Sequence, residues 1–174
     1  MNGVVRKVIL ALGLCCCFAG CGGGGGSSAP PPTTAPTKAI LTLSSQGTLA
    51  PGISMSGIGV TVNFPPGVTV KTDSNGAVST GVVVPSGVVD PNQSIISPPV
   101  YTPASSTALG ELGFTLASSQ PAGFSTGEFV TINCDITPGA SPKPTDFTIT
   151  EFSPVDLDGV AISGLSGVIT VHLE

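Results

Sequence analysis

Apolar and polar residues alternate with a period of two in four segments beyond residue 38. In the segment 58–64, isoleucine, two valines and phenylalanine alternate with glycine, threonine and asparagine. The same alternation recurs in segments 112–116, 130–136 and 169–173. Successive side chains of a strand point to opposite faces, so the pattern predicts strands that bury one face and expose the other.

Turn signals separate these segments and complete the fold prediction. The chain contains 24 glycines and 17 prolines, which are the residues least suited to the interior of a helix. They cluster in turns such as Pro-Pro-Gly at 65–67 and Pro-Gly at 138–139. Further candidate strands are 40–44, 68–71, 81–84, 94–101, 147–152 and 160–163. We therefore predict an all-β fold in which two antiparallel sheets pack as a sandwich of eight or nine strands.

The pattern of the first 21 residues predicts an export signal. Arg6 and Lys7 precede an apolar run at 8–18, which has the length of the apolar h-region of a signal peptide and is too short to span a bilayer. Residues 18–21 read Phe-Ala-Gly-Cys, which resembles the lipobox of bacterial lipoproteins. This resemblance implies that residues 1–20 are removed and that Cys21 is lipidated. The alternatives are an ordinary signal peptide cleaved elsewhere and an uncleaved anchor.

Residues 21–38 form a predicted tether between the lipidated Cys21 and the folded region 39–174. The tether contains five consecutive glycines and three consecutive prolines, which make it flexible first and then extended. We expect the domain to lie in the cell envelope, attached to the lipid bilayer through acyl chains. Gly22, rather than aspartate, follows the lipidated cysteine, and this favours the outer membrane.

The charge and cysteine content of the mature chain limit its partners. Lys38, Lys71 and Lys143 stand against ten acidic residues, which gives a formal charge of −7. A surface without basic clusters argues against binding to nucleic acid or to anionic headgroups. Cys134 is the only thiol left after lipidation, so no disulfide can form within the chain.

Three segments together are similar to the cohesin family of β-sandwich modules. The first is 58–70, in which a strand ends in an aromatic residue and a Pro-Pro-Gly turn. The second is 127–140, a later strand and its turn. The third is 147–173, in which Val-Asp-Leu-Asp-Gly precedes a final apolar strand. The resemblance implies a jelly-roll sandwich of about nine strands that docks a partner domain on one sheet face without calcium. Pro65 stands where many cohesins have aspartate, and glycines replace polar residues that bind dockerins.

A candidate partner-binding face follows if the strands pair as in that family. Its residues would be the polar members of three alternating strands: Thr61, Asn63, Glu111, Thr115, Thr131, Asn133 and Asp135. The alternative is an ordinary solvated sheet face.

Signs of catalysis or metal binding are weak. His172 is the only histidine and falls on the polar side of the last strand, which predicts an exposed side chain without a catalytic role. Cys134 alternates with apolar residues, which predicts a buried and unreactive thiol. The sequence Asp156-Leu-Asp158-Gly lacks the further ligands of a calcium loop and predicts a turn. We therefore expect no enzyme activity, no catalytic residues, no cofactor and no metal.

Three functions from different classes follow from these features. The first is a membrane-anchored interaction module that binds a dockerin-like or other envelope protein. The second is a carbohydrate-binding module for polysaccharide, which would need the single tyrosine, Tyr101, as an exposed stacking surface because the chain has no tryptophan. The third is a hydrolase with a carboxylate pair that is brought together only by folding.

Overall fold

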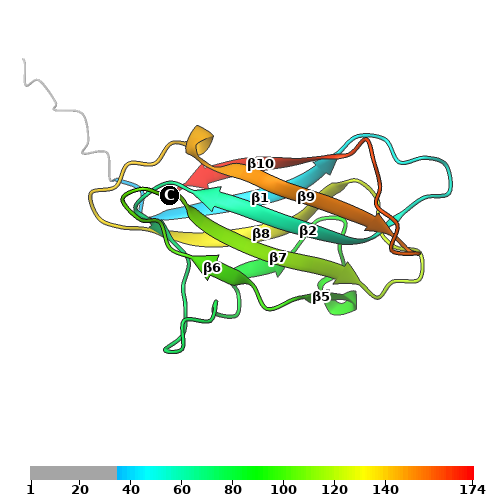
Figure 1. The fold of residues 1–174 in the computed structure, drawn as a ribbon, viewed down its shortest axis with the longest axis horizontal. Coiled ribbons are helices and arrows are strands. Elements are labelled where there is room, and N and C mark those ends of the chain that lie inside the picture. Colours follow the sequence, from blue (N-terminus) through cyan, green and yellow to red (C-terminus); the bar gives the residue numbers. More distant parts are fainter. Residues whose placement is uncertain (1–34) are drawn as a thin grey trace, which may run out of the picture. The chain divides into compact units, whose positions relative to one another are not determined.

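Ten strands in two antiparallel five-stranded sheets make up the fold (Figure 1). The computed structural model describes residues 35–174, which belong to one compact unit spanning 34–174. The predicted signal peptide 1–20, Cys21 and the tether as far as residue 34 lie outside the described residues. Within the described part, the prediction of an all-β, two-sheet antiparallel sandwich is confirmed, with ten strands in place of about nine.

Each sheet has a central strand that pairs on one side with two short strands. Sheet A consists of β1 (Lys38–Gln46), β3 (Val68–Thr69), β4 (Val83–Pro85), β8 (Gly127–Ile136) and β10 (Ser166–Leu173), in the order β10-β1-β8, with β3 and β4 both on the far side of β8. Sheet B consists of β2 (Met55–Phe64), β5 (Ser94–Ile96), β6 (Val100–Thr102), β7 (Gly110–Ser118) and β9 (Thr148–Asp156), in the order β9-β2-β7, with β5 and β6 both on β7.

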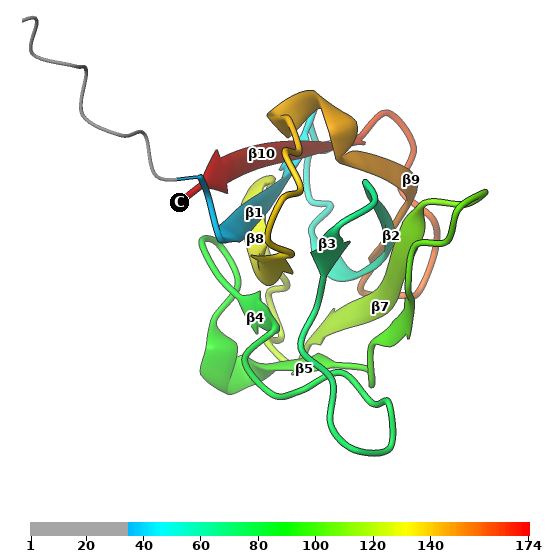
Figure 2. The same cartoon turned by 90° about the vertical axis from the view of Figure 1, so that its left-hand side faces the viewer.

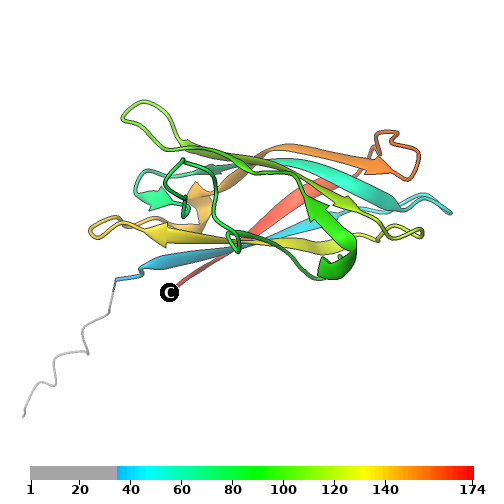
Figure 3. The ribbon, with the colours of Figure 1, turned by 90° about the horizontal axis from the view of Figure 1, so that it is seen from below.

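The chain rolls the two sheets over one another. β1 pairs with β8 in sheet A, and the segments that follow β1 and precede β8 continue as the pair β2 and β7 in sheet B. This transfer of an antiparallel ribbon from one sheet to the other is the arrangement of a jelly roll. Figure 3 shows the two layers edge-on, and Figure 2 views them from one end. Two short 3-10 turns, η1 (Pro91–Gln93) and η2 (Pro144–Asp146), lie in the connections.

The core is built from the apolar residues of the alternating pattern. On β2, β7 and β8 these side chains are at most 5% exposed: Ile58, Val60, Val62, Phe64, Leu112, Phe114, Leu116, Val130, Ile132, Cys134 and Ile136. Phe64 lies at one end of this core, with Phe147 and Tyr101 each 6.3 Å away between ring centroids. The prediction that each of these strands buries one face is confirmed.

The predicted strands 94–101 and 160–163 differ most from the observed ones. The segment 94–101 forms two short strands, because Pro98 and Pro99 supply no N–H to the ladder and interrupt it. The segment 160–163 forms no strand and contributes only an isolated bridge between Ala161 and Val155. Its residues belong to a turn in which the Asp156 carboxylate accepts hydrogen bonds from the N–H groups of Asp158 and Val160, at 2.9 and 2.8 Å.

Candidate partner-binding face

The seven residues predicted to form one face lie on the outer faces of two different sheets. Thr61 and Asn63 on β2 and Glu111 and Thr115 on β7 belong to sheet B. Thr131, Asn133 and Asp135 on β8 belong to sheet A. The prediction of a single shared face is therefore wrong. The physical reason is that β8 pairs with β1, β3 and β4, while β7 and β2 pair with each other in the opposite layer.

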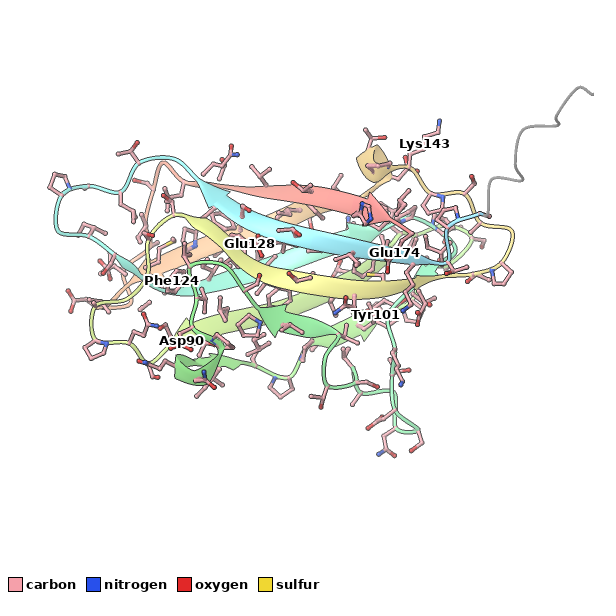
Figure 4. All side chains as sticks on the ribbon, turned by 180° about the vertical axis from the view of Figure 1, so that it is seen from behind. Asp90, Tyr101, Phe124, Glu128, Lys143 and Glu174 are labelled. Atoms are coloured by element: carbon pink, nitrogen blue, oxygen red, sulfur yellow. The ribbon has the colours of Figure 1, made fainter. Side chains whose placement is uncertain are left out.

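On sheet A the polar groups of β8 are engaged by neighbouring segments. The Thr131 hydroxyl donates to the Ser86 hydroxyl at 3.2 Å, and the Asn133 amide donates to the Gly81 carbonyl at 2.9 Å. Asp135 lies opposite Lys38 of β1 and Thr69 of β3. A hollow of about 210 Å³ beside these residues is lined by charges of both signs, among them Lys38, Lys71, Asp135 and Glu174. Figure 4 looks onto this sheet and labels Glu128 and Glu174.

On sheet B the four predicted residues surround a bare strip of backbone. Asn63 lies opposite Glu111, Thr61 opposite Gly113, and Thr115 opposite Gly59. Thr61 donates from its hydroxyl to a carboxylate oxygen of Glu151 on β9 at 3.1 Å. The structure thus brings Thr61 and Thr115 together around two outward-facing glycines.

These residues line a hollow of about 290 Å³, which we call the sheet-B trough. The trough consists of Gly59, Thr61, Gly113 and Thr115 as its floor and Ser97, Pro98, Val100 and Glu151 as its walls. The connection between β5 and β6 forms one wall, and it is fixed to β7 through one residue. The Thr115 N–H donates to the Ser97 hydroxyl at 2.8 Å, and the Ser97 N–H donates to the Thr115 carbonyl at 2.9 Å.

The hollow exists because two strand positions have no side chain. A Cβ atom added at Gly113 would come no nearer than 3.8 Å to any atom outside its chain neighbours, and one added at Gly59 no nearer than 3.6 Å. Both values are ordinary van der Waals contacts, so the packing of the sheet does not require glycine at either position. The sequence signal for this site is glycine at the outward-facing strand positions 59 and 113. The predicted set of face residues does not include these two glycines.

Apolar side chains stand beside the trough. Val100, which pairs with Gly113, is 71% exposed, and Ile95, which pairs with Ala117, is 70% exposed. A floor of small residues beside protruding aliphatic side chains provides a shape into which an apolar group can fit. Glu151 is the carboxylate in the wall and Glu111 lies on the same sheet face, so this face carries negative charge.

Cys134 is buried, His172 is exposed and Asp156 lies in a turn, as the sequence predicts. Cys134 is 3% exposed, and burial raises the pKa of its thiol to about 12, with a smaller contribution from the charge of Asp135. His172 is exposed on β10, and Asp156 closes a turn. Among residues 35–174, no cluster of three or more histidine, cysteine, aspartate or glutamate side chains is arranged to hold a metal ion.

Tyr101 is not available as a stacking surface. Its ring packs against Phe64 at the edge of the core, its hydroxyl is buried, and burial raises its pKa. The phenylalanines within the described part of the chain are buried or half-buried. This arrangement does not favour carbohydrate recognition, which relies on exposed aromatic rings.

No family model, curated protein or solved structure matches the chain. The described residues contain no helix that is long and apolar enough to span a membrane. The resemblances to lipoproteins and to cohesins, and the expectation that the chain is not an enzyme, therefore stay predictions from the sequence.

Proposed function

We propose that this protein is an interaction module of the bacterial cell envelope, anchored through acylated Cys21, that binds another protein in the sheet-B trough. The observation that carries the proposal is the pair of outward-facing glycines, Gly59 and Gly113, each with room for a Cβ atom without a clash. The lipobox-like segment before Cys21 supports the anchor, and the overall negative charge supports a protein rather than a nucleic-acid partner.

The energetic cost of these glycines supports a role in binding. Glycine in the interior of a strand destabilises a fold by roughly 0.5–1 kcal/mol relative to alanine, because it loses more conformational freedom on folding. A glycine that avoids a steric clash offsets this cost, but the sheet has room for a Cβ atom at both positions. Close approach of another molecule is a further physical reason for a bare strand surface, and it is the one that we propose here.

The surroundings of the trough indicate the chemistry of the partner group. Val100 and Pro98 provide an apolar wall, and the Glu151 carboxylate provides an acceptor and a negative charge on the opposite side. An aliphatic or aromatic side chain with a neighbouring lysine or arginine would meet both features. The partner protein is therefore expected to present an apolar residue flanked by a basic one.

Filling the trough tests this function through two effects of opposite sign. Gly113→Ala is expected to stabilise the domain by roughly 0.5–1 kcal/mol, because alanine fits without a clash and restricts the unfolded chain. Urea denaturation monitored by circular dichroism measures this change. A loss of stability would show that the sheet, and not a partner, requires glycine at this position.

The larger variant Gly113→Val is expected to reduce recovery of the partner in a pull-down from the native envelope fraction. An effect of about tenfold corresponds to about 1.4 kcal/mol of binding free energy. The control is Thr42→Val, which places the same β-branched side chain on the outer face of sheet A on β1. Equal loss of the partner from both variants, or from neither, would contradict binding in the trough.

A further inference from the structure

We propose that two copies of this chain associate through the free edge of β10. The β10 strand of one copy pairs with the β10 strand of the other in antiparallel orientation, and this joins the two copies of sheet A into one continuous sheet. This surface lies in the opposite layer from the sheet-B trough, so the proposal does not depend on the function proposed above. It rests on the backbone groups at this edge, on the design of the other sheet edges, and on the charge of the strand.

The pairing of β10 with β1 leaves one row of backbone groups pointing away from the sheet. Lys38 and Glu174 exchange both of their backbone hydrogen bonds, and the register continues without a shift to Gln46 and Ser166. In an antiparallel ladder such pairs alternate with pairs that do not bond to each other. The N–H and C=O groups of the intervening residues therefore point to the free edge: Gly167, Ile169, Val171 and Leu173.

The other three sheet edges carry features that prevent pairing with another strand. β9 contains Pro154 and two shifts of register against β2. The edge formed by β5 and β6 is broken by Pro98 and Pro99, and the edge formed by β3 and β4 consists of strands of two and three residues. Short strands, prolines and bulges are the means by which proteins protect sheet edges. β10 has eight residues, no proline and no register shift.

The inward-facing side chains of β10 are incompletely covered. Ile169, Val171 and Leu173 are half-buried, whereas the corresponding side chains of β1 and β8 are at most 5% exposed. Phe152 and Ile149 of β9 cover the inward side of Gly167 at the start of the strand, and its backbone edge stays free. η2 contacts β10 and lies beside its carboxyl end in Figure 1. The stretch 167–171 is therefore the part of the edge that an added strand would cover.

A second copy of this chain is the occupant that the charge distribution favours. Residues 159–171 contain no ionisable side chain, and neither do residues 39–70, which include β1 beside β10. Two copies that each carry a charge of −7 beyond Cys21 repel one another least along this neutral strip. Antiparallel self-pairing centred on Ile169 places Gly167 opposite Val171 and Val168 opposite Thr170, so β-branched residues meet along most of the contact.

A cysteine scan in the full, membrane-attached chain tests this contact. Single cysteines are introduced at Val168, Ile169, Thr170 and Val171, and disulfide-linked dimers are measured after mild oxidation of intact envelopes. Only positions near the two-fold axis bring two identical residues within the 4.4–6.8 Å between Cα atoms that a disulfide needs. We therefore expect a strong dimer band at one or two of the four positions.

The matched control is Thr42→Cys, which lies on β1 opposite Thr170, one strand further from the edge. The Thr42→Cys variant is expected to give no more disulfide-linked dimer than random collisions in the membrane produce. Adding Ile169→Lys to the strongest of the other three cysteine variants is expected to abolish its band, because an inward-pointing charge at an edge disfavours pairing. No band at any of the four positions, a band of equal strength at Thr42, or a product whose mass shows a different protein would overturn the proposal.

Discussion

Replacing Phe64 with alanine is expected to lower the free energy of unfolding by about 3–5 kcal/mol. Phe64 is fully buried at the end of β2 and contacts the rings of Phe147 and Tyr101. The substitution removes one of the largest fully buried side chains and leaves a cavity between the two sheets. Small domains have a total stability of about 5–15 kcal/mol, so the variant is expected to unfold at a much lower urea concentration.

Phe152→Ala is the matched control for this prediction. Phe152 is also a phenylalanine on an inward-facing side of sheet B, but it is half-buried beside Gly167 at the open side of the sandwich. Its loss is expected to cost clearly less than the loss of Phe64. Equal losses for the two variants would contradict the position of the core between β2, β7 and β8.

Raising the pH above 9 is expected to destabilise the domain through Cys134. Burial raises the pKa of this thiol from 9.0 to about 12 in the folded protein. In the unfolded chain the thiol loses its proton near pH 9, while the folded chain still holds it. The unfolded state then binds fewer protons than the folded state, so stability falls as the pH rises. The slope is about 1.4 kcal/mol per pH unit between pH 9 and pH 12.

Urea midpoints measured from pH 8 to pH 11 test this effect, with Cys134→Ala as the comparison. The substitution removes the ionisable group and is expected to flatten the alkaline fall in stability. Part of the fall is expected to persist, because burial also raises the pKa of Tyr101. Identical slopes in the two proteins would show that the thiol is exposed to solvent and that β8 presents its other face to the core.

The core of this fold could be predicted from the sequence because it depends on a local pattern. The period of two assigns Ile132 and Cys134 to the same side of a strand without any knowledge of the neighbouring strands. The structure confirms this for β2, β7 and β8. Such a pattern does not indicate which strands pair, because pairing joins segments that are distant in the chain.

This limit explains the errors in the predicted face. Thr115 and Thr131 are separated by a short stretch of sequence, and both are outward-facing strand residues. The connection between β7 and β8 nevertheless carries the chain from one sheet to the other, so the two side chains point in opposite directions. The wall of the trough was also missed, because Ser97 and Pro98 belong to a connection between short strands and show no periodic pattern.

Two features of the proposed sites did leave a signal in the sequence. Gly59 and Gly113 interrupt otherwise well-formed strands at outward-facing positions, and a partner surface is one physical reason for such glycines. The stretch 159–171 has no ionisable side chain, and neither do 39–70 and 112–127, so only the strand order places a neutral segment at a sheet edge. Both signals needed the pairing of the strands before they could be interpreted.

Site-specific photo-crosslinking in living cells tests the binding face most directly. A photo-activatable side chain is placed at the exposed Val100 in the wall of the sheet-B trough, and at Asn133 on the outer face of sheet A as the comparison. Binding in the trough predicts a discrete adduct with one protein from Val100 and none from Asn133. An adduct from Asn133 without one from Val100 would contradict it.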